Sequence, residues 1–273
     1  MPSDPPVIGA CLPVHRLADF RDWLLEADRD LELQSFETAE ALDGDWRPLA
    51  EEAKRLLDGH GGRRGIHGPF RGFAIDAPDP EIRRLVERRL MQGLDVCEAV
   101  GADHMVIHSP YTAWDHANFG DQPDARARIV EDVHATLAAV VRRAETQGVT
   151  LVIENVADVD PGERRRLAES FGSERVKLSL DTGHAQYAHA SCGAPPVDYF
   201  VEDAGPALAH VHLQDADGHA DRHWPIGEGT IRWEPVFRAL ARQAGRPRLL
   251  LELRDPDGIP AAMETLRGRG LGR

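Results

Sequence analysis

Cysteine is scarce in this chain of 273 residues, which contains only three, Cys11, Cys97 and Cys192. Three scattered cysteines cannot build the dense disulfide framework of a small secreted domain. No apolar run approaches the roughly 18 residues that a membrane-spanning helix needs. The first 14 residues also lack the basic start and long apolar stretch of a signal peptide. We therefore expect a soluble cytoplasmic protein without a membrane partner.

Positive charge is also in short supply. The chain has 32 Lys and Arg against 46 Asp and Glu, a net charge of −14. A phosphate backbone is usually bound by a basic face, so this balance disfavours a nucleic-acid partner without excluding a local basic patch. The glycine-rich motifs GxGxxG and GxxxxGK[ST] of nucleotide sites do not occur in the sequence. A small-molecule substrate is the expected partner, and homo-oligomer formation is left open.

The chain does contain a regular alternation of short apolar segments and segments of helical periodicity. The apolar segments have the length and the Val, Ile and Leu content of buried strands. They are Val7–Leu12, Leu31–Phe36, Arg64–His67, His104–His108, Thr150–Asn155, Val176–Asp181, Ala209–Leu213 and Arg248–Leu253. Eight such strands alternating with helices predict an α/β fold, a (β/α)₈ TIM barrel forming a single domain over residues 1–273. An open doubly wound sheet is the alternative.

Helix boundaries carry weaker signals. The apolar period is clearest over Ile82–Val100 and Ile129–Val141. Asp79-Pro80 and Asp160-Pro161 are typical helix starts, with proline in the first turn. Gly101 and Gly148 follow the two periodic segments, as helix-ending glycines do.

Six of the predicted strands end with a side chain that can bind a metal ion. These are His67, His108, Glu154, Asp181, His212 and Glu252, separated by 27 to 46 residues, about one βα unit each. Each alone is more often a polar residue satisfied by its neighbours than a ligand. In a barrel, however, all parallel strands end on the same face, so the six would converge there. Carboxylates and imidazoles without cysteine suit Zn, Mn, Co, Fe or Mg, and a carboxylate can bridge two ions.

Two further segments add candidates. His184 follows Asp181 by three residues, where the next helix would start. Asp221-Arg222-His223 lies in a segment of about residues 214–232, which is long for a βα connection, and long loops usually carry function.

At this point the chain resembles the xylose-isomerase-like TIM-barrel superfamily, which includes sugar isomerases, ketose 3-epimerases and endonuclease IV. The resemblance runs from about the second strand to the eighth, and the ordered set of motifs is more specific than any one of them. The motifs are His67-Gly68-Pro69-Phe70, His108-Ser109-Pro110, Glu154-Asn155, Asp181-Thr182-Gly183-His184, His210-Val211-His212-Leu213-Gln214-Asp215, Asp221-Arg222-His223 and Leu251-Glu252-Leu253.

The resemblance to the isomerases and epimerases implies one divalent metal ion, Mn, Co or Mg, held by Glu154, Asp181, His212 and Glu252. The metal would stabilise an enediolate of a small sugar, a sugar phosphate or a related hydroxy-carbonyl compound. Glu154 and Glu252 would transfer the proton as catalytic base and acid.

The resemblance to endonuclease IV implies a different enzyme, a zinc hydrolase of phosphoesters with two or three Zn or Fe ions. Glu154 would bridge two ions and activate the attacking hydroxide. The net charge of −14 and the absence of recognisable duplex-inserting loops count against DNA as its substrate. The ligand set would be His67, His108, Glu154, Asp181, His184, His212, Asp221, His223 and Glu252. A non-catalytic protein that binds a ligand and retains a metal is the third alternative.

Several residues are expected to contact the substrate. In the isomerase interpretation His184 would bind a hydroxyl, and Arg222 or Arg254 would bind a phosphate. Trp114 and Trp224, expected on loops after the fourth and seventh strands, could form apolar walls for a sugar ring.

Three further features of the sequence are given mainly structural interpretations. Packing is the preferred role for Cys11. One of Glu32 and Gln34 is expected to point into the barrel. The run 164–166, three arginines beside Glu163 and Glu169, is expected to form a solvated helix face.

Overall fold

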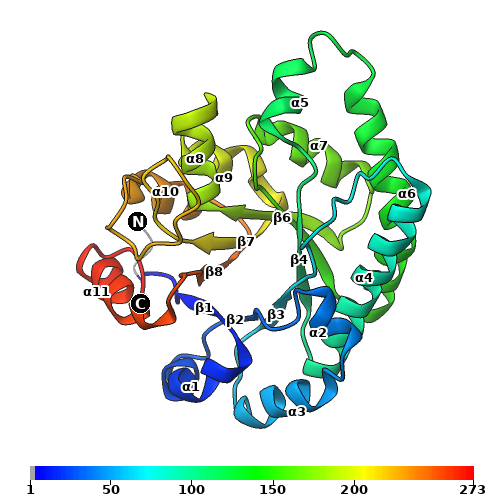
Figure 1. Cartoon of the computed structure of the whole chain (residues 1–273). Coiled ribbons are helices and arrows are strands. Elements are labelled where there is room, and N and C mark those ends of the chain that lie inside the picture. The colour runs from blue at the N-terminus through cyan, green and yellow to red at the C-terminus, as the bar shows by residue number, and fades with distance from the viewer. Residues whose placement is uncertain (1–3) are drawn as a thin grey trace.

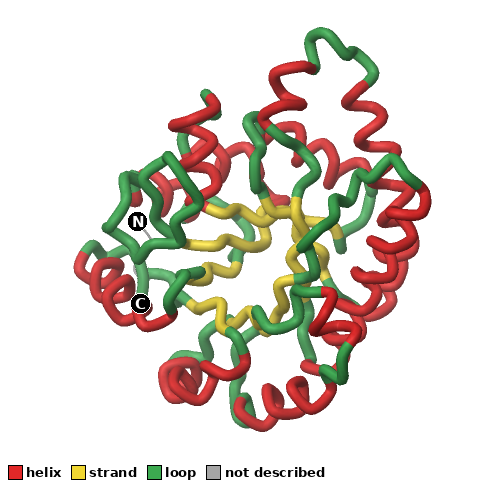
Figure 2. The backbone as a smooth tube through the Cα atoms, viewed as in Figure 1, coloured by secondary structure: helices red, strands yellow, loops and turns green. Residues whose placement is uncertain are grey.

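The structure, a computed structural model, describes residues 4–273. Eight parallel strands pair in sequence order, and β8 pairs with β1, so the sheet closes into a barrel surrounded by helices (Figures 1 and 2). This confirms the single-domain (β/α)₈ barrel and excludes the open sheet. The strands are β1 (Gly9–Leu12), β2 (Leu31–Leu33), β3 (Arg64–His67), β4 (His104–His108), β5 (Thr150–Glu154), β6 (Val176–Asp181), β7 (Leu208–Leu213) and β8 (Arg248–Leu251).

The helices follow the strands around the outside of the barrel. The α-helices are α1 (Leu17–Glu26), α2 (Ala39–Asp43), α3 (Arg47–Leu56), α4 (Pro80–Val100), α5 (Ala113–Asn118), α6 (Ala125–Gln147), α7 (Pro161–Ser170), α8 (Thr182–Cys192), α9 (Val197–Ala204), α10 (Trp233–Leu240) and α11 (Ile259–Gly268). Short 3₁₀ turns are η1 (Val14–Arg16), η2 (Gly205–Ala207) and η3 (Pro256–Gly258). None of the helices within residues 4–273 is both long enough and apolar enough to cross a membrane.

The predicted helix signals are confirmed at both ends of the helices. Asp79 and Asp160 cap α4 and α7, because their carboxylates accept the N–H groups of the second helical residues at 2.7 and 2.8 Å. Gly101 and Gly148 end α4 and α6 with φ of 68° and 74°, the left-handed conformation that glycine adopts without strain.

Several strands are shorter than the apolar segments that predicted them. β1 begins at Gly9 rather than Val7, β2 ends at Leu33, β5 ends at Glu154 and β8 ends at Leu251, whereas β7 begins one residue early at Leu208. Phe36 and Leu253 are buried without belonging to a strand. Apolar content therefore indicated burial, and burial extends beyond the residues that pair in the sheet.

The interior of the barrel is unusually polar. Successive residues of a strand point alternately inward and outward, and bulky apolar side chains normally fill such an interior. Here the outward residues, such as Leu33, Ile107 and Ile153, are buried against the helices. The inward positions include Cys11, Glu32, Gly65, His67, His104, His108, Glu154, Ser179, Asp181, His210 and His212. The sequence therefore forms a polar interior within an apolar shell.

Candidate functional site

The predicted strand-end residues meet at one end of the barrel. His108 on β4 lies opposite Glu154 on β5, and Asp181 on β6 lies opposite His212 on β7. Glu252 comes directly after β8, one residue beyond the strand. Parallel strands in register present equivalent side chains at one level, so these residues form a single polar surface at the carboxyl end of the barrel.

Group 1 consists of His67, His108 and Glu154. The Nε2 atoms of His67 and His108 lie 3.7 and 3.5 Å from Oε2 of Glu154. That oxygen is buried and has no hydrogen-bond partner among residues 4–273. An unpaired buried carboxylate oxygen facing two imidazole nitrogens suits a cation better than a hydrogen bond.

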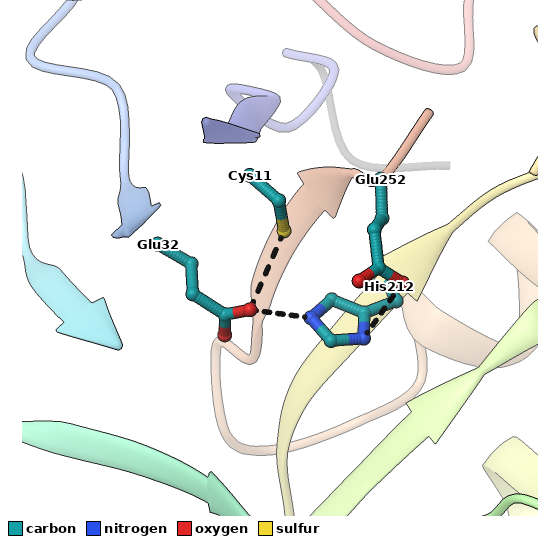
Figure 3. A group of neighbouring side chains, drawn as sticks. All are labelled: Cys11, Glu32, His212 and Glu252. Atoms are coloured by element: carbon teal, nitrogen blue, oxygen red, sulfur yellow. Dashed lines mark hydrogen bonds and ion pairs between the residues drawn. The ribbon is translucent and has the colours of Figure 1, made fainter. Parts of the chain in front are cut away.

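Group 2 consists of Glu154, Asp181, His212 and Glu252, all buried, with one ligand atom of each within 4.8 Å of the others. Nδ1 of His212 lies 2.8 Å from Glu154 Oε1 and 3.2 Å from Glu252 Oε2. On the other side of the ring, Nε2 lies 3.0 Å from Glu32 Oε1 (Figure 3). A proton on Nε2 would leave the Nδ1 lone pair directed into the group.

Group 3 consists of His184, Asp221 and His223. The Nε2 atoms of the two histidines lie 3.4 and 3.0 Å from Oδ1 of Asp221. His184 is the third residue of α8, inside the helix rather than in the loop before it. His223 has a φ of 51°, a left-handed conformation that a non-glycine residue rarely adopts and that often marks functional sites.

Three of the five histidines in these groups share one hydrogen-bonding arrangement. Nδ1 of His67, His184 and His223 lies 2.9, 2.9 and 3.1 Å from the carbonyl oxygens of Gly68, Asn155 and Glu252, respectively. A proton shared with a carbonyl fixes the tautomer and frees Nε2 as a ligand, which is how metal-binding histidines are commonly held. The donor set, without thiolates, suits Zn, Mn, Co, Fe or Mg. The residues thus fit a divalent metal.

Two neighbouring carboxyl groups differ in proton affinity. Burial raises the pKa of Glu252 to about 7, against the opposing effect of His212 and His223. Burial also acts on Glu154, but the charge and hydrogen bond of His212 hold the pKa of Glu154 well below its usual value. Two carboxyl groups in one site with separated pKa values are suited to exchange protons with a bound molecule.

Sequence reasoning gave no role to two amides that connect the groups. The side-chain nitrogen of Gln214 donates to Asp181 and Asp221, each at 3.1 Å, and its oxygen accepts the N–H of His223 at 2.8 Å. Asn155 accepts the N–H of Asp181 at 2.9 Å and donates to its carbonyl at 3.0 Å. Both amides lie within two residues of a ligand in the motifs, which was the available signal.

The long segment after β7 is organised by one carboxylate that the sequence did not single out. Asp215 accepts the N–H groups of Gly227 and Ile231 at 2.8 and 3.2 Å and the indole N–H of Trp233 at 3.0 Å. A Cβ on Gly229 would lie 2.2 Å from Asp215 Oδ1, so only glycine fits there. This frame positions Asp221 and His223.

Four of the five predicted substrate-contacting residues lie at or beside the groups. Arg222, Trp224 and Arg254 line a cavity of about 720 Å³ together with Asp221 and His223, and His184 belongs to group 3. The Arg222 guanidinium lies over the Trp224 ring at 5.1 Å. The two arginines are partly engaged, because Arg222 pairs with Asp217 at 2.8 Å and Arg254 donates to the carbonyl of Asp221 at 3.1 Å.

Trp114 is placed differently from the expectation. It lies in the short helix α5 rather than in a loop, and 75% of its surface is exposed. Helix α5 projects beyond the barrel at the top of the view in Figure 1. A contact between Trp114 and substrate stays a prediction.

Three further expectations need correction or detail. Glu32 and Gln34 both point inward, because residues two apart share a face of a strand; Gln34 donates to Glu252 at 2.6 Å. Arg164 is fully buried and donates to the carbonyls of Ile153 and Ser179, so the arginine run is only partly a solvated face.

Cys11 is buried as expected, yet it faces the polar interior, with its sulfur 3.7 Å from Glu32 Oε1 (Figure 3).

Fold and site together define an α/β-barrel protein with a candidate divalent-metal centre at the carboxyl end of its strands. The sequence matches the xylose isomerase-like TIM barrel family over residues 25–269, and the chain belongs to that family. The resemblance drawn from the motifs is therefore confirmed.

Similar solved structures include sugar epimerases, and the fold is one used by sugar epimerases and isomerases. A D-tagatose 3-epimerase-like protein has a TM-score of 0.77 at 20% identity, with 96% of each chain covered. The 3-keto-D-glucoside 4-epimerase YcjR of E. coli has a TM-score of 0.68 at 18% identity, covering 96% of this chain and 99% of that one. The TTHB071 protein of Thermus thermophilus, from a crystal soaked with ZnCl₂, has a TM-score of 0.72 at 28% identity, covering 97% of this chain and 99% of that one.

Curated relatives include two uncharacterized proteins of Methanocaldococcus jannaschii. MJ1311 is 23% identical over 183 residues, which are 64% of this chain and 59% of MJ1311, so the match spans less than two thirds of that relative. MJ1614 is 20% identical over 229 residues, covering 82% of this chain and 84% of that one.

Proposed function

We propose that this protein is a divalent-metal-dependent isomerase or epimerase of a small sugar, a sugar phosphate or a related hydroxy-carbonyl compound. The observation that carries the proposal is group 2, where Glu154 at the end of β5 and Glu252 just after β8 approach the same nitrogen of His212. Two such groups close together can remove a proton from one side of a carbon and return one to the other side or to the adjoining atom. The sugar epimerases among the similar structures support the same substrate class.

Metal binding and proton transfer would both be carried out by residues of group 2. Group 2 would hold the cation, which when bound supplies Lewis acidity that polarises the substrate carbonyl and acidifies the adjoining C–H bond. The low pKa of Glu154 keeps this carboxylate ionised, so it would accept the proton from carbon. Glu252, whose pKa is about 7, would hold or deliver a proton. Gln34 donates to Glu252 at 2.6 Å and orients it.

The rim would bind the remainder of the substrate. His184 would contact a hydroxyl group, and Trp224 would cover the apolar face of the sugar carbons. Arg222 or Arg254 would donate hydrogen bonds to a phosphate group where the substrate carries one. Arg222, Trp224 and Arg254 line the cavity beside group 3, and His184 belongs to that group.

The decisive experiment is hydrogen exchange at carbon. We would incubate the Mn-, Co- or Mg-loaded protein in D₂O with a panel of ketoses, aldoses and their phosphates and follow loss of C–H signals by NMR. Glu154→Gln and Glu252→Gln should each lower the exchange rate by about 10²- to 10⁴-fold with an unchanged circular dichroism spectrum.

The matched control is Glu169→Gln, a half-exposed glutamate of α7 paired with Arg165 outside the site. It should exchange at the wild-type rate. Normal exchange in either site variant would overturn the assignment of the two glutamates.

A second function, a multinuclear hydrolase of phosphoesters, is favoured by groups 1 and 3. A single-metal isomerase needs group 2 alone, whereas these two groups would hold further cations, and several close metals suit phosphoester hydrolysis. The metal content of protein purified without added metal separates the two proposals. About one Mn, Co or Mg ion per chain favours the isomerase. Two or three Zn or Fe ions, together with hydrolysis of small phosphodiesters or abasic DNA, would favour the hydrolase.

A further inference from the structure

A second cluster of metal-binding side chains lies one layer deeper in the barrel than groups 1 to 3. It consists of Glu32 on β2, His104 on β4 and His210 on β7, which we call the inner cluster. His104 precedes His108 by four residues and His210 precedes His212 by two, so both side chains point inward below those of the candidate site. Their exposed fractions are 0, 2 and 0%.

The polar atoms of the inner cluster converge without forming hydrogen bonds. Nε2 of His210 and of His104 lie 3.2 and 3.6 Å from Oε2 of Glu32. Among residues 4–273, these three atoms and Nδ1 of His104 have no hydrogen-bond partner. Leaving a buried donor or acceptor unpaired costs about 1–3 kcal/mol, and three of these four atoms lie close together in the centre of the barrel.

The separations match those of ligands around one ion. Bonds of about 2.0–2.1 Å in a tetrahedron place neighbouring ligand atoms about 3.3–3.4 Å apart. The two measured distances, 3.2 and 3.6 Å, bracket that value. The shorter contact is at the upper limit of hydrogen-bond length, yet neither contact has the alignment of a hydrogen bond.

Two of the remaining atoms of the cluster are already held by neighbours. Nδ1 of His210 lies 2.8 Å from the hydroxyl oxygen of Ser179, and Oε1 of Glu32 lies 3.0 Å from Nε2 of His212. Partners of this kind orient ligands from the side facing away from the metal. Each of the two residues therefore keeps one atom free, and it is the atom that faces the cluster.

The strand between β2 and β4 provides the space, because Gly65 of β3 lies beside both Glu32 and His104. Gly65 is the inward residue of β3 at this level, and a Cβ there would lie 1.9 Å from Cε1 of His104. Any other residue at position 65 would displace the His104 ring, since a clash with a ring wedged inside the barrel has no easy relief. The His104 ring therefore occupies the space that a side chain at position 65 would otherwise fill.

We propose that Glu32, His104 and His210 form a further metal site, distinct from groups 1 to 3, that binds one divalent cation of the zinc type through two imidazoles and a carboxylate. The ion would cross-link β2, β4 and β7 in the centre of the barrel. Through Glu32 it would also fix the ring of His212 above it. The site is closed by protein on all sides, so we assign it a structural role rather than a reaction.

The direct test is anomalous scattering from crystals of the wild-type chain equilibrated with ZnCl₂. We expect a difference peak at the zinc absorption edge between the three side chains, about 2.0–2.2 Å from each ligand atom. Absence of a peak there, while groups 1 to 3 are occupied, would overturn the proposal and leave an imidazole–carboxylate network in its place.

Metal counts in variants give an independent readout. His104→Phe and His210→Asn should each bind one zinc ion fewer per chain than wild type. The control is His60→Gln, a buried histidine outside the barrel whose Nε2 lies 2.7 Å from the carbonyl of Arg29, which should keep the full count. Equal counts in all folded variants would contradict the site, and two cluster variants are used because one of them could fail to fold.

Discussion

The two ends of the barrel treat their charged side chains in opposite ways. At the amino end of the strands, Arg248 pairs with Asp103, Arg63 pairs with Asp30 at 2.5 Å, and Arg29 donates to the carbonyls of Ile8 and Arg273. At the carboxyl end, His67, His184 and His223 bind a carbonyl with one nitrogen and leave the other facing a carboxylate. One end is closed by its own partners, whereas the other keeps ligand atoms available.

This difference separates stability from function along one axis of the molecule. Changes at the amino end should alter the free energy of unfolding and leave the chemistry intact. Changes at the carboxyl end should alter metal binding and turnover. Each of the following predictions tests one side of that division.

Removing metal should have the largest effect. Dialysis against a chelator should abolish turnover and lower the melting temperature, because an ion that binds only the folded chain stabilises it by about 4 kcal/mol at a thousandfold excess over Kd. Differential scanning fluorimetry against added Zn²⁺ or Mn²⁺ measures the shift. A melting temperature independent of metal would contradict the metal centre.

Gln214→Leu should come next. The side chain holds Asp181, Asp221 and the backbone of His223 in place, and loss of such outer partners typically costs about 10- to 100-fold in metal affinity or activity. Titration of the apo protein with metal measures the change. The control is Gln243→Leu, which removes a hydrogen bond to the carbonyl of Val201 outside groups 1 to 3. Equal metal affinity of the two variants would refute the role of Gln214 in holding the ligands.

Arg29→Met should affect stability alone. Arg29 is 2% exposed and donates to three carbonyl groups at the amino end, so its loss should lower the free energy of unfolding by about 1–3 kcal/mol. Denaturant titration gives that number. The exposed Arg55→Met is the control, and a fall in kcat of the folded Arg29 variant would break the division between the two ends.

Trp224→Ala and Trp114→Ala should have the smallest effects and should differ. Trp224 lines the cavity beside group 3, so its removal should raise KM about 2- to 10-fold. Trp114, with 75% of its surface exposed, should change KM less than Trp224 does. Initial-rate kinetics on the substrate found by hydrogen exchange decides between them, and a larger effect at Trp114 would place the substrate toward α5.

The sequence predicted the barrel because each strand is a short apolar run and the segments between them show helical periodicity, most clearly over Ile82–Val100 and Ile129–Val141. It also predicted which residues share the carboxyl face, since a parallel barrel leaves no other arrangement. It could not predict the separation into three groups, because that depends on which imidazole nitrogen each backbone carbonyl engages. Nor did it reveal that Arg164 is buried, because a run of three arginines looks the same whether its first member faces solvent or the strands.

The inner cluster shows a further limit. One of Glu32 and Gln34 was expected to face inward, but His104 and His210 were interpreted only as parts of a strand and a motif. Their importance arises from pairing across the barrel, between β2, β4 and β7, and from the missing side chain at Gly65. No local pattern in the sequence encodes those long-range neighbours.

Asp215 has a consequence for how the family could diversify. The carboxylate of Asp215, at the start of the segment between β7 and α10, accepts hydrogen bonds from three residues at the end of that segment and the start of α10. The stretch between these anchor points behaves as a cassette, whose ends are fixed while its positions other than Asp221 and His223 are free to vary in composition. The same barrel could therefore carry different versions of this segment without changes in its strands, provided that Asp215 and Gly229 are kept.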